Sequence, residues 1–336
     1  MINSKFRSVV MVLGAAVALL ACRPDKDAPT ASTEQGPTHL AKVRALVLES
    51  VTEGGTVVYY SKGREPRARA VLAMVGGFLA RYTSAYGPVT LHVAVLTEPD
   101  WKATIDNPYG VPGIRDPGDK PIAFMPADVE QGSLYREVIA LADKLPAATK
   151  DDIAAKCGSL SACTLKFADL IILHEISHVY VERMAFGRPN MWVGELAPDY
   201  LVYQYLRGDQ QPELGAWTIM NAVMARMTPH VKSLDDLEQR RREEGALDRL
   251  EPELPRLHGI LMERIPEVYD RVGADFIPRL VKAFPRQENP TGCGTKGLNA
   301  GICRSQELPE AEVLRRLDAI TPGFTAWAGS YGTARR

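Results

Sequence analysis

The chain has 336 residues, 46% of them hydrophobic and 24% charged, and its 40 Lys and Arg residues are balanced by 41 Asp and Glu. This composition is ordinary for a globular protein and excludes a disordered, collagen-like or coiled-coil chain. The formal net charge of −1 argues against nucleic acid as a partner, because nucleic-acid binding needs a strongly basic face.

Residues 1–21 have the pattern of a secretory signal peptide. A positively charged start precedes an apolar run over residues 9–21, which is shorter than the roughly 20 residues that span a bilayer. The segment ends in Leu-Leu-Ala-Cys, which resembles the bacterial lipobox. That resemblance implies a lipid anchor at Cys22, and Arg23 after it implies the outer membrane, facing the periplasm. The alternatives are an ordinary secretory signal and an uncleaved anchor.

The rest of the chain divides into a tether, a mixed half and a helical half. Residues 22–38 are rich in Pro, Thr, Ser and charge and predict a flexible tether. Residues 39–206 combine strand and helix patterns, whereas residues 207–336 are mainly helical in pattern. The prediction is therefore an α+β fold with a helical C-terminal subdomain.

Strands and helices are mixed in the first half. Residues 39–60 alternate loosely around Gly54-Gly55 and predict a hairpin, and residues 67–86 predict a helix that Gly87-Pro88 ends. Residues 89–96 are the best strand, and residues 106–119 read as a Pro/Gly loop. Residues 121–126 predict an edge strand, because proline is tolerated only at edges.

Helical spacing dominates the remainder of the chain. The predicted helices cover residues 134–145, 165–185, 194–206, 216–227, 234–250 and 307–320, with a further helical pattern over 257–284 that Pro266 and Pro278 break. His39 and His92 are expected to be structural, since one borders the tether and the other lies mid-strand.

Four cysteines besides Cys22 form two close pairs in the sequence. An exported protein meets an oxidising compartment, where disulfides are the default. Three pairings are possible, and the local ones are favoured, Cys157–Cys163 and Cys293–Cys303. The alternatives are four free thiols and a Cys₄ zinc site, which the spacing does not favour because neither pair reads CxxC.

Residues 174–178 read His-Glu-Ile-Ser-His within an apolar helical run. Side chains four residues apart lie on one face of a helix, so His174 and His178 can hold one metal ion. Glu175 lies beside them and can take a proton from a water whose pKa zinc lowers towards about 7. The alternative is a pair of core histidines with an exposed Glu, but neutral imidazoles buried without a metal leave polar nitrogens to satisfy.

A Trp-x-x-Glu pattern follows the motif, with Glu195 seventeen residues after it. This arrangement resembles the gluzincin metallopeptidases, nearest to the peptidase MA-like group and more distantly to thermolysin and aminopeptidase N. The resemblance covers residues 165–206 and implies a zincin-like fold with one Zn²⁺ ion. The roles that it implies are zinc ligation by His174, His178 and Glu195, general-base catalysis by Glu175 and orientation of a ligand imidazole by Asp199.

Two residues depart from the family pattern. Leu196 replaces the usual Gly, and Pro198 stands where a helix interior is expected. Because proline suits only the first turn, the helix is expected to begin near Glu195. If it does not, Asp199 becomes the alternative ligand. A further alternative is that Glu195 is simply a helix-start carboxylate stabilised by the helix dipole.

The group that stabilises the oxyanion is harder to choose. Gluzincins usually supply a Tyr or a His for this role, and the candidates are Tyr203, His230, His258 and Tyr269. Ordinary, partly buried polar roles are the alternative for each. The predicted edge strand over residues 121–126 is a possible binding edge for an extended peptide, by analogy with other zincins.

Together these patterns predict a lipid-anchored zinc metallopeptidase acting on a peptide or protein substrate. One rival is a zincin-like envelope lipoprotein that no longer cleaves and serves as a binding or assembly module. Another is a zinc hydrolase acting on a peptidoglycan-type or ester substrate. No aminopeptidase-type exopeptidase motif precedes the HExxH segment.

Overall fold

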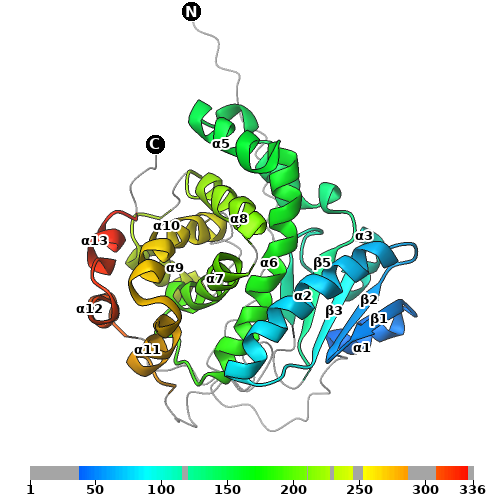
Figure 1. Ribbon diagram of the computed structural model, residues 1–336, viewed down its shortest axis with the longest axis horizontal. Coiled ribbons are helices and arrows are strands. Elements are labelled where there is room, and N and C mark those ends of the chain that lie inside the picture. The colour runs from blue at the N-terminus through cyan, green and yellow to red at the C-terminus, as the bar shows by residue number, and fades with distance from the viewer. Residues whose placement is uncertain are drawn as a thin grey trace, which may run out of the picture.

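A small mixed sheet and a larger set of helices make up the computed structural model, which describes residues 38–115, 120–209, 211–227, 231–244, 253–286 and 308–331 (Figure 1). The expected α+β class is confirmed. The predictions for the signal peptide, the tether, Cys22, Cys293, Cys303 and His230 concern residues outside these ranges.

The sheet has five strands in the order β1-β2-β3-β5-β4. They are β1 (Glu49–Glu53), β2 (Thr56–Tyr60), β3 (Leu91–Leu96), β4 (Gly113–Arg115) and β5 (Ile122–Pro126). The inner strands β2, β3 and β5 run parallel, and β1 and β4 are antiparallel additions at the two edges.

Strand β5 is not at the edge, so that prediction is wrong. The strand β4 comes from the predicted Pro/Gly loop and covers β5 over the pairs Gly113 with Phe124, Ile114 with Ala123 and Arg115 with Ile122. Pro126 lies beyond this pairing, at the last position of β5. Its missing N–H is therefore tolerated at a strand end rather than along an edge.

The start of the predicted hairpin is a helix instead. Helix α1 (His39–Ala45) precedes β1, and the side chain of Thr38 accepts a hydrogen bond from the backbone N–H of Ala41. Leu40 and Val43 are buried with helical spacing. Over so few residues, loose alternation and a helical stripe look alike, and the cap decides between them. The strands β1 and β2 do form a hairpin around Gly54-Gly55.

Helices cover both faces of the sheet. Helices α2 (Glu65–Tyr86) and α6 (Leu160–Arg183) lie on one face, and α1 and α3 (Glu98–Thr104) lie on the other. Because side chains alternate along a strand, β3 sends Val93 and Val95 into one core and Ala94 and Leu96 into the other. All six residues of β3 are buried as a result.

The second half of the chain packs on the side of α6 away from the sheet, so that α6 runs through the middle of the molecule (Figure 1). The remaining helices are α4 (Ser133–Ile139), α5 (Ala147–Cys157), α7 (Met191–Gly208), α8 (Gln211–Met224), α9 (Leu234–Glu244), α10 (Leu254–Val272), α11 (Phe276–Ala283), α12 (Glu310–Ile320) and α13 (Phe324–Gly329). Helices α5 and α13 are not predicted from the sequence. Helix α10 continues through Pro266, where a break is predicted, because burial of its apolar face outweighs one lost hydrogen bond.

A disulfide joins Cys157 at the end of α5 to Cys163 in the first turn of α6, as predicted. The two helices meet at a bend of 68°. In the described part of the chain, no single helix is long and apolar enough to cross a membrane, although this bent pair passes that test when both are taken together.

Candidate metal centre

Two imidazoles project from the middle of α6. The Nε2 atoms of His174 and His178 lie 3.2 Å apart, and their rings meet edge to face with centroids 4.9 Å apart. The side chain of His174 is 6% exposed and that of His178 is 15% exposed. The four-residue spacing thus brings both rings to one largely buried place beside α7.

Helix α7 begins at Met191, one turn before the predicted start, so the prediction that it begins near Glu195 is wrong. The side chain of Asn190 accepts a hydrogen bond from the backbone N–H of Val193. The carboxylate of Glu238 on α9 accepts two more, from the N–H groups of Met191 at 2.7 Å and Trp192 at 3.2 Å. These acceptors satisfy the free N–H groups of the first turn and stabilise its positive end.

Pro198 therefore lies inside α7 and not in its first turn. It cannot donate to the carbonyl of Gly194, four residues earlier, and a helix interior normally excludes it for this reason. Every residue over 191–206 except Glu195 is buried. The burial of nearly the whole helix outweighs the lost hydrogen bond and fixes the direction in which Glu195 projects.

Two carboxylates of α7 contact the two nitrogens of His174. On one side, Oε2 of Glu195 lies 3.1 Å from Nε2 of His174 and 3.4 Å from Nε2 of His178. On the other side, Oδ1 of Asp199 lies 2.8 Å from Nδ1 of His174. Glu195 thus lies beside the Nε2 atoms of both imidazoles, whereas Asp199 contacts the opposite edge of the His174 ring.

A third imidazole, His258 from α10, completes the cluster. Its Nδ1 lies 2.9 Å from Oδ2 of Asp199, and its ring is 4.8 Å from that of His174. The side chain of Asp199, 1% exposed, therefore bridges two histidines. Of the four candidates for the oxyanion role, His258 and Tyr269 lie at about the family's distance beyond Glu195, but spacing alone does not choose between them. His258 follows Asp199 by 59 residues and belongs to no local motif.

A buried ion pair holds the start of α10 in place. Arg256 is fully buried and donates hydrogen bonds to a carboxylate oxygen of Glu253 and to the backbone carbonyl of Tyr331, each at 2.5 Å. The hydroxyl of Tyr331 donates to the same oxygen of Glu253 at 2.9 Å. This network lies less than one turn from His258 and ties its helix to the end of the described chain.

The next residue, Gly259, sets how closely α10 can approach α8. A Cβ atom there would lie 2.3 Å from the backbone N of Ala225 and 2.5 Å from the backbone O of Asn221. We therefore expect Gly259→Ala to force the helices apart, to lower the free energy of unfolding by about 1–3 kcal/mol and to displace His258.

Urea denaturation checks this expectation, with Gly76→Ala as the matched control. A Cβ at Gly76, in the interior of α2, meets no atom within 4 Å. The control should be neutral or gain about 0.5–1 kcal/mol from the reduced backbone entropy. Equal stability of the two variants would contradict the close approach described for α10.

Tyr203, Tyr269 and Glu175 form no hydrogen bond or ion pair with the side chains of the cluster. The rings of Tyr203 and Tyr269 pack on each other with centroids 5.6 Å apart, and Tyr269 is about 16 Å further along α10 than His258. Glu175 is partly buried, and no residue in the described ranges forms a hydrogen bond or ion pair with its carboxylate.

The imidazoles and carboxylates of the cluster shift one another's pKa values in the direction opposite to the effect of burial. Burial lowers the pKa of His174, but the carboxylates of Asp199 and Glu195 raise it well above its usual value. Burial raises the pKa of Glu195, but His178 and His174 hold that pKa well below its usual value. The pKa of Asp199 is likewise lowered, because His258 and His174 outweigh its burial. Both carboxylates are ionised at neutral pH and attract a positive charge to the site.

Two overlapping sets of side chains could hold a metal ion. One ligand atom from each of His174, Glu195 and His258 lies within 4.8 Å of the others. The atoms of His174, Glu195 and His178 lie closer still, between 3.1 and 3.4 Å apart. The sets share His174 and Glu195 and differ only in the second imidazole, which is that of His258 or of His178.

Comparisons with known protein families, with curated proteins and with solved structures found no match.

Proposed function

We propose that this protein is a zinc metallopeptidase of the gluzincin type, with His174, His178 and Glu195 as the zinc ligands. The observation that carries the proposal is the convergence of three ligand atoms on one largely buried place. Nε2 of His174 lies 3.1 Å from a carboxylate oxygen of Glu195 and 3.2 Å from Nε2 of His178. Nδ1 of His174 lies 2.8 Å from the ionised Asp199, so the ring can keep a proton on Nδ1 and offer a lone pair on Nε2 once a metal ion replaces the second proton. The two imidazoles and the carboxylate can then share one cation.

The separations fit the preference of zinc. Zinc takes nitrogen and oxygen ligands at about 2.0–2.2 Å in a tetrahedral arrangement, which sets neighbouring ligand atoms about 3.3 Å apart. The three separations here are 3.1, 3.2 and 3.4 Å. Two imidazoles and one carboxylate also match the donor set of catalytic zinc sites, which keep one position open for water or substrate.

The position of Glu175 supports hydrolysis. When bound, zinc polarises a carbonyl group and makes water more acidic. Glu175 directly follows His174 on α6, and its carboxylate has no partner among the described residues that would occupy it. A carboxylate so placed can accept a proton from the attacking water and pass it to the leaving amine.

His258 suits a role in stabilising the oxyanion. Its Nδ1 is hydrogen-bonded to Asp199, so its Nε2 is the nitrogen left for substrate. When that nitrogen is protonated, the ring can donate a hydrogen bond to the negative oxygen that develops in the transition state. The ionised Asp199 stabilises the resulting imidazolium, much as a buried aspartate does in the Ser-His-Asp triad.

A second candidate function follows from the set that includes His258 among the possible metal-holding residues. If His258 ligates zinc together with His174, His178 and Glu195, four protein ligands close the site. Closed, four-ligand sites are structural rather than catalytic. The protein would then be a zincin-like binding or assembly module.

The wider setting belongs to the same proposal. Helix α6 packs on β5 and β4, which is consistent with a zincin-like arrangement of an HExxH helix on a mixed sheet. Of the two edge strands, β4 is the one that contacts α6, which makes it the candidate for pairing with an extended substrate. We also propose that the mature chain is anchored by a lipid at Cys22 and acts on peptide or protein substrates outside the cytoplasm.

One experiment separates these functions. Mature protein is assayed for metal content and for casein hydrolysis, with and without a chelator, as wild type and as His258→Ala. A peptidase holds one zinc per chain in both forms, loses hydrolysis with the chelator, and is slowed by the substitution about 10²–10³-fold. A closed site shows no hydrolysis and binds zinc much more weakly without His258. Wild-type protein that takes up no zinc contradicts both functions. A protonated His174 would then be the positive charge that the two carboxylates of α7 stabilise.

A further inference from the structure

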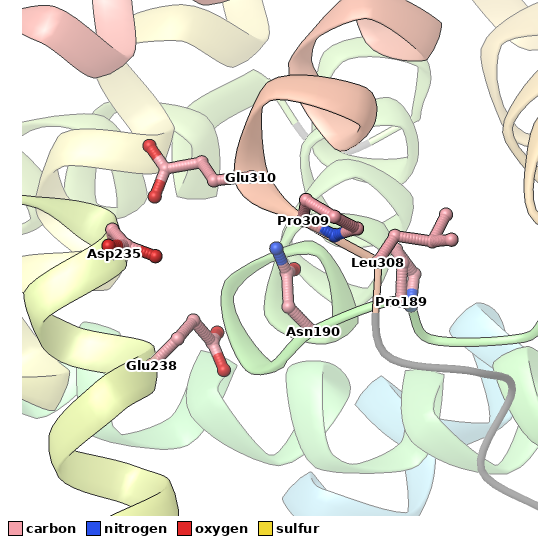
Figure 2. A pocket seen from close by; sticks show the side chains of 7 residues that line it. All are labelled: Pro189, Asn190, Asp235, Glu238, Leu308, Pro309 and Glu310. Atoms are coloured by element: carbon pink, nitrogen blue, oxygen red, sulfur yellow. The ribbon is translucent and has the colours of Figure 1, made fainter.

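The starts of three helices meet at a pocket separate from the metal centre (Figure 2). Its volume is about 340 Å³, and its walls come from the segments that open α7, α9 and α12. Three of the lining residues are acids, Asp235 and Glu238 on α9 and Glu310 on α12, and the described lining includes no basic residue. Figure 2 shows the side chain of Glu310 on the same side of the pocket as the two α9 carboxylates.

The pocket adjoins the first turn of the helix that carries Glu195. Glu238, 5% exposed, accepts the hydrogen bonds from the N–H groups of Met191 and Trp192. The backbone N–H of Leu308, just before α12, donates to the carbonyl of Pro189, just before α7, at 3.4 Å. The start of α12 is thus bonded to the start of α7, and Glu195 lies one turn further along.

Glu310 is the unsatisfied member of the three acids. Its Oε2 is buried and has no hydrogen-bond partner among the described residues. Burial, and then the charges of Asp235 and Glu238, raise its pKa from 4.5 to about 7. The shift has the expected sign, because burial and like charges both oppose ionisation.

The charged groups on neighbouring elements are engaged with other partners. On α12 itself, Glu312 pairs with Arg315 and Arg316. On α9, Arg240 pairs with Asp236.

The elements on either side supply no compensating charge. Before α7, Arg188 pairs with Glu182. Helix α11 also packs on α12, but its Arg279 and Lys282 do not contribute to the pKa of Glu310. No basic side chain that the structure describes contributes to the pKa of Glu310.

We propose that the start of α12 holds the start of α7 in a proton-dependent way, with protonated Glu310 stabilising the contact and ionised Glu310 weakening it. The proton is bound more tightly in the folded chain than in the unfolded chain. Stability is therefore lost as the pH rises from 4.5 through about 7, and the whole loss is present above that range. The pocket gives water access to the ionised carboxylate once the contact loosens. This inference does not depend on the proposed peptidase activity.

The test compares the full chain with Glu310→Gln and Glu312→Gln at about pH 4, below the unfolded pKa of Glu310, and at about pH 8.5. Gln cannot ionise, so Glu310→Gln should match wild type within about 1 °C in Tm at the lower pH. At the higher pH it should exceed wild type by a few °C. Glu312 is the matched control, because its arginine partners lower its pKa to about 2 and it stays ionised throughout.

Hydrogen exchange locates the effect. In wild type, the amides of Met191 and Trp192 should exchange faster at the higher pH than intrinsic base catalysis explains, and Glu310→Gln should remove the excess. A difference in Tm between Glu310→Gln and wild type that is the same at both pH values would overturn the proposal. So would a pH-dependent Tm difference without any change in exchange at the start of α7.

Discussion

Replacing Glu175 by Gln is expected to lower kcat for peptide hydrolysis by about 10²–10⁴-fold, the usual contribution of a positioned general base. The amide has nearly the same shape as the carboxylate but cannot accept the proton. Because no described residue depends on Glu175 for a hydrogen bond or ion pair, the fold should be unaffected. Zinc content should also stay at one per chain, since Glu175 is not among the proposed ligands.

Steady-state kinetics and metal analysis of the same preparation give the result. Glu213→Gln on α8 is a suitable control, because it removes one carboxylate from a partly buried position on a different helix. It should leave kcat and zinc content unchanged. Wild-type hydrolysis by Glu175→Gln would rule out the proposed base, whereas loss of zinc in that variant would show that Glu175 is a ligand.

Replacing His174 by Ala is expected to abolish stoichiometric zinc binding and hydrolysis together. This ring contacts Glu195 and His178 through one nitrogen and Asp199 through the other, so its loss removes one proposed ligand and the contact that connects the other two to Asp199. The zinc Kd should rise by far more than the 10–100-fold that loss of an outer partner typically costs.

Metal analysis after dialysis, with circular dichroism to verify the fold, measures this result. His39→Ala, in α1 on the far face of the sheet, is the control and should keep its zinc. Glu195→Gln provides a second, smaller change at the same site if the alanine variant does not fold. Full zinc occupancy in both site variants would eliminate the proposed centre.

The local parts of the site were predictable because helix geometry alone determines them. The spacing of His174 and His178 requires a shared face, and the structure gives it. The start of α7 was not predictable, since it depends on a hydrogen-bond acceptor from Glu238, 47 residues after Met191. Pro198 is tolerated inside α7 because nearly the whole helix is buried, and that burial is likewise not encoded in the local sequence.

The same contrast between local and distant determinants explains the fold. Helix α2 and strand β3 were predictable, because the apolar pattern of each is long enough to show its period. The seven residues of α1 and the three of β4 are too short to show a period. His258 joins the centre only through the packing of α10 on α7 and α8, and sequence spacing does not encode that packing.

The bridge made by Asp199 has a consequence for the order in which the protein is made. Synthesis delivers the HExxH helix and both α7 carboxylates well before α10 emerges, because His258 follows Asp199 by 59 residues. Until α10 is present, Oδ2 of Asp199 has no imidazole partner, and the apolar faces of α7 and α8 that pack on α10 are not covered. A nascent chain halted at residue 206 would thus contain every predicted ligand yet lack His258, which ties completion of the cluster to translation of helix α10.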